Sequence, residues 1–270
     1  MGSLSNFGEN ALLNHLTRNS AYTPVATLYL ALATANPNET ATGASMNEVA
    51  NSGAYARTAI TFGAAASRRV TQSGTVTFTQ ATGSWGTVTH WAIVDSATYG
   101  AGNVLAYGAL GSSRSIVINN TPSIASTEVW VEITASNGIS NYAANGFLDR
   151  MFRNQAFNEN NTYAALCTAA PTDSSTGSTI TEPSGNGYAR VIINGNGGGA
   201  PAWGAVSGGS VTSAAATFPT PTGAGWGNVT HQAITDALTT GNVLWYGAQD
   251  AANLVAASDT VTQAFTINQS

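Results

Sequence analysis

The side chains best suited to catalysis are two histidine–aspartate pairs at matched places in the sequence. His90 lies five residues before Asp95, and His231 lies five residues before Asp236. A histidine beside a carboxylate is the arrangement of a general base. Residues five apart on a β-strand, however, face opposite sides and lie about 16 Å apart. Both aspartates also precede Gly-Asn turn sequences. We therefore interpret them as turn formers, and each histidine as a hydrogen-bonded strand residue near the tryptophan of its segment.

Other patterns that could carry chemistry lack the required context. The glycines of Gly195–Ala200 resemble a dinucleotide-binding loop, but Pro201 follows where a helix would be needed to receive the phosphate. Cys167 ends an apolar, strand-like run, which favours a buried thiol. The sequence has no nucleophile elbow, HExxH motif or Cys/His zinc spacing. We expect a loop at Gly195–Ala200, and we expect no enzyme activity, no cofactor and no metal.

These residues belong to a sequence that occurs twice. Ser5–Asn19 returns as Ser140–Asn154, and further matches follow in order. The residues recurring at matched motifs are Tyr55, Arg57, Trp85, His90, Asp95 and Tyr107 in the first half, and Tyr188, Arg190, Trp226, His231, Asp236 and Tyr246 in the second. We interpret these twelve residues as a structural signature. So long a period indicates a duplicated domain, not a solenoid. We predict homologous domains over residues 1–137 and 138–270, joined by a very short linker near residues 136–138.

The elements that must position these residues are mostly strands. Each half opens with one short amphipathic helix, expected over residues 6–19 and 141–154, with Asn6 and Asn141 as possible caps. Strand-like segments and Gly/Asn/Pro turns follow. In the first half, the expected strands are residues 25–33, 55–62, 75–78, 88–94, 104–109, 116–118 and 127–134. The fold class is therefore mainly β: two tandem antiparallel β-sandwiches, jelly-roll-like, each opened by a short α-helix.

Composition limits the partners. Only 8% of the 270 residues are charged, all eight basic residues are arginine, and the net charge is −5. Nucleic-acid binding needs many Lys and Arg to neutralise phosphates, so we expect no nucleic-acid partner. We expect no membrane partner either, because no apolar run approaches the ~20 residues that cross a bilayer. The opening residues lack a signal-peptide pattern, which predicts synthesis and folding in a host cytoplasm. A neutral polar surface suits packing against other proteins, although stable extracellular β-domains share it.

One motif combination resembles a known family. It comprises Trp85–Asp95 and Gly102–Leu110 with Leu30–Thr34 and Gly53–Arg57 upstream, and it recurs around Tyr188, Trp226 and Gly241–Ala248. It is similar to small virion proteins of tailed bacteriophages that are labelled head-decoration or tail-fibre proteins. The resemblance implies β-sandwiches of about this half's size and brings no catalytic residues. The two helical openings are not part of it.

Two functions follow from this resemblance. The first is a capsid cement or decoration protein on the outer capsid surface, bridging the major capsid protein and neighbouring copies of itself. A tandem duplication would then act as a pseudo-dimer that gains avidity. The alternative is a tail-fibre or tail-tip module that binds a host glycan or receptor. Trp91, Trp130 and Trp245 would then stack on sugar rings, whereas we expect them to pack in the core or at an interface.

Overall fold

The computed structural model describes residues 2–134, 138–157, 160–194 and 199–269. Within them the fold is mainly β, with one short helix at the start of each repeat, which confirms the predicted fold class. The first repeat contains β1 (Gly2–Leu4), α1 (Asn6–Thr17), β2 (Leu28–Ala33), β3 (Thr58–Ile60), β4 (Arg69–Thr71), β5 (Val76–Thr77), β6 (Gly86–Val94), β7 (Val104–Ile116), β8 (Ser123–Ile124) and β9 (Trp130–Glu132).

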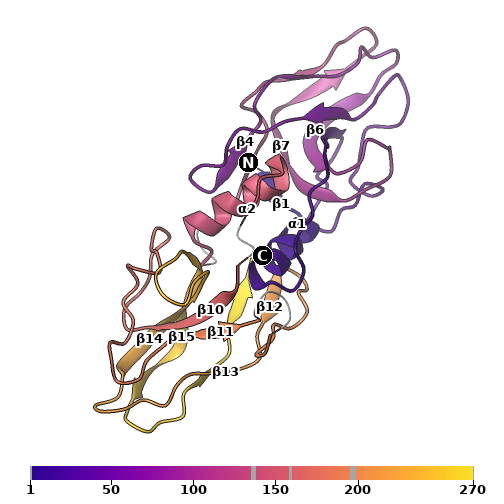
Figure 1. Ribbon diagram of the computed structural model, residues 1–270. Helices are drawn as coiled ribbons and strands as arrows, with labels where there is room; N and C mark the ends of the chain where they lie inside the picture. The colour runs from indigo at the N-terminus through magenta and orange to yellow at the C-terminus, as the bar shows by residue number, and fades with distance from the viewer. Residues whose placement is uncertain (1, 135–137, 158–159, 195–198, 270) are drawn as a thin grey trace. The chain divides into compact units, whose positions relative to one another are not determined.

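The second repeat follows the same plan (Figure 1). It contains α2 (Asn141–Arg153), β10 (Thr162–Cys167), β11 (Val191–Ile193), β12 (Ser210–Thr212), β13 (Ala216–Thr217), β14 (Gly227–Thr235), β15 (Val243–Val255), β16 (Thr262–Gln263) and β17 (Thr266–Asn268). Two sequence features fall partly outside the described residues: the linker, at 135–137, and the glycine-rich loop, at 195–198.

The chain divides into two compact units that are not continuous in sequence. Unit 1 consists of Met1–Glu9, Thr23–Ile133 and Asn145–Ala156, and unit 2 of Asn10–Tyr22, Thr134–Ala144 and Phe157–Ser270. Most of α1 thus belongs to the unit that holds the strands of the second repeat. Most of α2 belongs to the unit that holds the strands of the first.

Contacts inside each unit show how its helical segment is held. In unit 1, the Phe152 and Phe62 rings lie 5.0 Å apart, and the Asp149 carboxylate accepts a hydrogen bond from the Ala65 amide at 2.8 Å. In unit 2, His15 stacks on Phe157 at 5.5 Å, and the Asn194 amide donates to the Thr17 carbonyl at 2.9 Å. A short helix needs such packing to be stable.

The two helices begin at the expected residues, end slightly earlier than expected, at Thr17 and Arg153, and are capped by the serine before each start. The Ser5 hydroxyl accepts a hydrogen bond from the Gly8 amide at 3.2 Å, and the Ser140 hydroxyl accepts one from the Ala143 amide at 3.1 Å. Serine is therefore the N-cap in both repeats, and the expected caps Asn6 and Asn141 are the first helical residues. The serine oxygen satisfies an amide that the helix leaves without a partner.

The core sheet of each unit has the same order. It runs β3-β2-β6-β7 in unit 1 and β11-β10-β14-β15 in unit 2, and β1, β9 and β4 extend the unit 1 sheet beyond β7. In the described sheets, pairing is antiparallel apart from β1 with β9. Both central hairpins carry a register irregularity at the same place, between Val88 and His90 and between Val229 and His231. Such a bulge bends the strand and curls the sheet.

The expected strand at 104–109 continues without a break to Ile116 as β7, whereas residues 117 and 118 of the strand expected at 116–118 lie outside any strand. The counterpart of β7, β15, has the same 13-residue length. The Gly/Ser run inside β7 stays extended because its end pairs with β6, Gly86 opposite Ile116. After this long hairpin, the chain returns through β8 beside β5 in unit 1 and through β16 beside β13 in unit 2. Each of these pairs is a two-stranded sheet separate from the core sheet of its unit.

Candidate functional site

The signature residues Tyr55 and Arg57 converge on Glu48 in unit 1. The Tyr55 hydroxyl donates to Glu48 Oε1 at 2.9 Å, and the Arg57 Nε and Nη2 groups donate to its two oxygens at 2.8 Å each. Arg57 also donates to the carbonyls of Ser96 and Ala101, at 2.9 and 2.8 Å. The Arg57 and Glu48 side chains are only 1% and 4% exposed. This fully hydrogen-bonded buried pair fastens loops together.

Unit 2 repeats this arrangement around Glu182. The Tyr188 hydroxyl donates to Glu182 Oε1 at 2.7 Å, and Arg190 pairs with Glu182 at 2.7 Å. Arg190 also donates to the carbonyls of Ala237 and Thr240, at 3.0 and 2.9 Å. Burial, followed by the adjacent glutamate charge, raises the pKa of both tyrosines well above the usual tyrosine range. These phenols stay protonated and act as structural donors.

The signature tryptophans pack on these tyrosines. The Trp85 ring lies edge-on to Tyr55 at 5.2 Å, and its indole donates to the Gly53 carbonyl at 2.7 Å. Trp226 lies edge-on to Tyr188, also at 5.2 Å, and donates to the Asn186 carbonyl at 3.0 Å. Edge-to-face pairs favour this geometry because the positive ring edge meets the negative face. The contacts link each tryptophan to the arginine–glutamate cluster through the tyrosine.

The histidines and aspartates of the signature have separate hydrogen-bond partners. His90 Nδ1 pairs with the Thr89 hydroxyl at 2.8 Å, and burial lowers the pKa of this imidazole. Asp95 accepts from the Asn103 amide and side chain at 2.6 and 2.7 Å, and Asp236 does so from Asn242 at 2.6 and 2.8 Å. His231 pairs with Thr230 at 2.8 Å. The structure therefore places the aspartates in turns, as the sequence predicts.

Glycine completes each aspartate turn. A side chain at Gly102, where φ is +83°, would lie 2.6 Å from Ser96 Cβ. At Gly241, where φ is +76°, it would lie 2.6 Å from Ala237 Cβ. Both the left-handed backbone and the close approach require glycine.

The last signature pair, Tyr107 and Tyr246, has different surroundings in the two units. Tyr246 donates to the Asp173 carboxylate. Burial raises the pKa of Tyr107, with further contributions from Glu39 and Glu9. Glu9 itself is buried, and its Oε2 has no hydrogen-bond partner in the described chain. Burial and the Glu39 charge raise the pKa of Glu9 to about 7.

Two of the three aromatic candidates for sugar stacking are buried, and the third is half-buried. Trp91 and Trp245 are 1% and 5% exposed, as expected for core packing. Trp130 carries the Arg69 guanidinium 3.8 Å above its ring. Cys167 is also buried, as predicted, and burial raises the pKa of its thiol to about 12. Trp91, Trp245 and Cys167 therefore offer no open binding surface, and the Trp130 ring is already in contact with Arg69.

The two glutamates at the centre of the clusters were not among the residues predicted from the sequence. Glu48 precedes Tyr55 by seven residues and Glu182 precedes Tyr188 by six, so the repeat of a glutamate before each tyrosine could have identified them.

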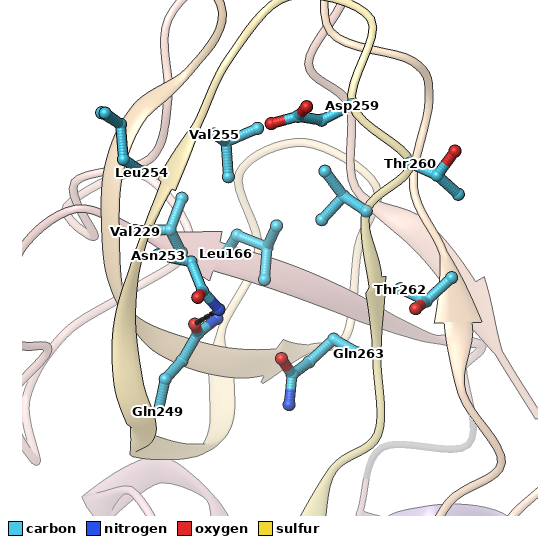
Figure 2. Close-up of a pocket in the computed structure, with 11 residues that line it drawn as sticks. Leu166, Val229, Gln249, Asn253, Leu254, Val255, Asp259, Thr260, Thr262 and Gln263 are labelled. Carbon is cyan, nitrogen blue, oxygen red and sulfur yellow. Dashed lines mark hydrogen bonds between the residues drawn. The ribbon is translucent and has the colours of Figure 1, made fainter.

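Unit 2 also contains a half-open pocket of about 320 Å³ that no sequence motif indicated (Figure 2). The pocket lies between the far half of β15 and the segment leading into β16. Its lining residues are Leu166, Val229, Gln249, Asn253, Leu254, Val255, Asp259, Thr260, Val261, Thr262 and Gln263. We call it the amide pocket.

The side chains of the amide pocket come from facing strands. Gln249 and Asn253 lie on β15 and hydrogen-bond to each other at 3.3 Å, whereas Gln263 and Thr262 lie on the opposite strand (Figure 2). Leu166 and Val229 are buried and lie between the two strands. The arrangement offers amides, hydroxyls and one carboxylate above an aliphatic floor, a composition suited to binding a small polar molecule.

In unit 1, other side chains occupy the positions that correspond to the amides of the amide pocket. The strand registers equate Gln249 with Leu110 and Gln263 with Ile124, and these two unit 1 side chains are buried. Arg114 takes the place of Asn253 and pairs with Glu128 at 2.6 Å. Apolar side chains and an ion pair thus occupy in unit 1 the positions that carry open amides in unit 2.

No group of three or more His, Cys, Asp or Glu side chains among the described residues has metal-site geometry. Neither described helix has the length and hydropathy to span a bilayer.

Comparison with known proteins accounts for the duplicated arrangement. The sequence matches the family described as "Podophage GP4 fiber I protein gp80" twice, over residues 3–132 and 138–269. A search of curated proteins gave no match. The two matches cover nearly the whole chain and coincide with the repeated clusters around Glu48 and Glu182. The chain therefore belongs to the podophage GP4 fiber I protein gp80 family, as a tailed-phage virion protein that carries the family's domain in tandem.

Proposed function

We propose that this chain is a non-enzymatic component of a podophage fibre, displayed outside the particle where it contacts the host surface. The observation that carries the proposal is the match of both repeats to a family described as a fibre protein. A fibre component needs a rigid scaffold that presents binding groups. The buried arginine–glutamate clusters supply such a scaffold in each unit.

The geometry of the signature residues favours a structural role over catalysis. A general base must lie within hydrogen-bond reach of the group that orients it. His90 pairs with Thr89, whereas Asp95 pairs with Asn103, so each side chain has a local structural partner. The same separation holds for His231 and Asp236.

A capsid cement protein is the second candidate. It is favoured by the covalent tandem of two homologous repeats, which would bind repeated sites on a shell with avidity. The low content of charged residues, 8%, also suits broad contacts with other protein. Its partners would be the major capsid protein and neighbouring copies of this chain. Under the fibre proposal, the partner of this chain would instead be a host receptor or glycan.

Copy number and position on the particle separate the two candidates. Quantitative mass spectrometry of purified particles gives the ratio of this chain to the major capsid protein, and immunogold labelling gives its position. A fibre component is expected in few copies, with label at the tail. A copy number that scales with the capsid protein, with label over the shell, would overturn the fibre proposal in favour of cement.

A further inference from the structure

We propose that the amide pocket of unit 2 binds a neutral carbohydrate. The inference deepens the proposed function, since it names the ligand class through which a fibre would contact a host surface. The biological role of the sugar depends on the proposed fibre function. The prediction that the pocket binds a sugar depends only on the side chains that line it.

The first argument is the supply of uncommitted hydrogen-bonding groups. Within the described chain, the hydroxyls of Thr260 and Thr262 make no hydrogen bond to other protein groups. The Gln249 amide uses its oxygen to accept from Asn253, which leaves its NH₂ group free. The Gln263 NH₂ group donates to the Ala264 carbonyl, which leaves its oxygen free. Donors and acceptors therefore alternate around the pocket, as a molecule with several hydroxyls requires.

The second argument is charge. Asp259 is the one ionisable side chain among the pocket's lining residues. One of its oxygens accepts a hydrogen bond from the Ala256 amide at 2.8 Å, and the other is available to a ligand hydroxyl. The carboxylate would repel a phosphate, a sulfate or an acidic sugar. This electrostatic bias disfavours anionic sugars and is compatible with a neutral one.

The third argument is the apolar floor. Buried Leu166 and Val229, together with half-buried Val261, supply the aliphatic lining of the pocket. One face of a pyranose ring presents C–H groups, which pack favourably on aliphatic side chains, while the hydroxyls at its rim reach the amides. The volume of about 320 Å³ suits a single sugar ring better than a long chain.

The comparison with unit 1 adds an independent argument. If these positions served the fold alone, aliphatic side chains would be favoured there, because burying them stabilises the fold. Unit 1 has such side chains, Leu110 and Ile124, and both are buried. Unit 2 keeps amides at both positions. Leu254 lies at the rim, 77% exposed, in a place where it could contact a bound ligand.

Saturation-transfer NMR on the full chain tests the proposal. The probes are methyl glycosides of glucose, galactose, mannose and N-acetylglucosamine, with glucuronic acid as the charged match for glucose. We expect transfer to at least one neutral glycoside and none to glucuronic acid. The double variant Gln249→Leu/Gln263→Ile, which installs the unit 1 residues, should weaken binding by about tenfold or more. No transfer to any neutral glycoside, or equal binding by the double variant, would overturn the proposal.

Two controls keep the result interpretable. Asn228→Leu replaces an exposed amide on β14 outside the pocket and should bind like wild type. Asp259→Asn keeps the side-chain shape, so it serves if the double variant fails to fold. It should weaken neutral-sugar binding several-fold, whereas Asp250→Asn, an exposed carboxylate outside the pocket, should not. Asp259→Asn binding like wild type would contradict the role of the carboxylate.

Failure of this inference and failure of the fibre proposal give different results. Sugar binding together with shell labelling would retain the amide pocket and remove the fibre role. Tail labelling together with no glycoside binding would retain the fibre and overturn the pocket's ligand.

Discussion

The two units differ in the side chains of their long hairpins and of the strands that follow, and they agree closely around their buried arginines. Arg57 and Arg190 each bind a glutamate and three backbone carbonyls in the same pattern. By contrast, Leu110 and Ile124 of unit 1 correspond to Gln249 and Gln263 of unit 2.

This contrast separates what the fold needs from what it tolerates. A buried guanidinium must have every donor satisfied, so any change around it is costly. The hairpin face lies near solvent, where an amide can replace an aliphatic side chain as long as water or a ligand reaches it. The duplicated domain can therefore keep its scaffold in both copies and develop a binding surface in one.

The largest expected loss of stability comes from removing the buried arginine that both units share. Arg57→Ala leaves the Glu48 carboxylate buried without its charge partner and should lower the free energy of unfolding by about 3–5 kcal/mol. Arg190→Ala should cost less, because Glu182 is 18% exposed whereas Glu48 is 4% exposed. Urea unfolding followed by tryptophan fluorescence measures both. Equal losses would contradict the link between burial and cost.

The matched control for these variants is Arg69→Ala. Arg69 also pairs with a glutamate, Glu132, at 2.7 Å, but the two side chains are 45% and 27% exposed. Exposed ion pairs contribute little, and the contact of Arg69 with the Trp130 ring adds about 0.5–1 kcal/mol, so the loss should stay below about 2 kcal/mol.

The next effect tests the difference between the hairpin faces. Ile124→Gln places in unit 1 the residue that unit 2 carries, but here the side chain is 1% exposed. The buried amide and the lost aliphatic contacts should lower the free energy of unfolding by about 2–4 kcal/mol. The reverse change, Gln263→Ile, should change it by less than about 1 kcal/mol, because Gln263 lines an open pocket.

Urea midpoints of these two single variants, measured side by side, give the comparison directly. Losses of similar size in both directions would show that the two faces are equally closed, and would remove the physical distinction on which the amide pocket rests.

Local sequence patterns were sufficient to predict much of this scaffold. The duplication, the β-rich fold and the aspartate turns depend on matched motifs and on turn residues such as Gly102 and Gly241. The exchange of helical segments between units could not be predicted in the same way. Ser5–Asn19 and Ser140–Asn154 have similar apolar patterns, so either helix fits either set of strands.

The amide pocket was also beyond local patterns, because it depends on how distant segments face one another. Gln249 and Gln263 meet across the pocket only through the irregular β14–β15 register and the return of β16 beside β13. The return path differs between units as well. Seven residue steps separate Ile124 from Val131 in unit 1, and four separate Gln263 from Ile267 in unit 2. The longer connection carries Glu128, which pairs with Arg114.

The smallest expected effect on stability concerns a difference between the two helix N-termini. Glu9 of the first repeat corresponds to Ala144 of the second. The pKa of Glu9 is raised from 4.5 to about 7, so the folded chain holds a proton there that the unfolded chain releases. This stabilisation is fully present below about pH 4.5 and is lost as pH rises through about 7. Allowing for solvent screening, the change should be about 1–2 kcal/mol.

Urea unfolding at about pH 5 and about pH 8 measures this contribution, with Glu9→Gln as the matched variant that cannot titrate. Wild type should lose more stability than Glu9→Gln between the two pH values, because only wild type must ionise a buried carboxyl. Glu39→Gln should reduce the difference, since the Glu39 charge is the second cause of the shift, after burial. Identical pH slopes for wild type and Glu9→Gln would mean that Glu9 is ionised in the folded chain throughout, and that the two helix starts do not differ in their response to pH.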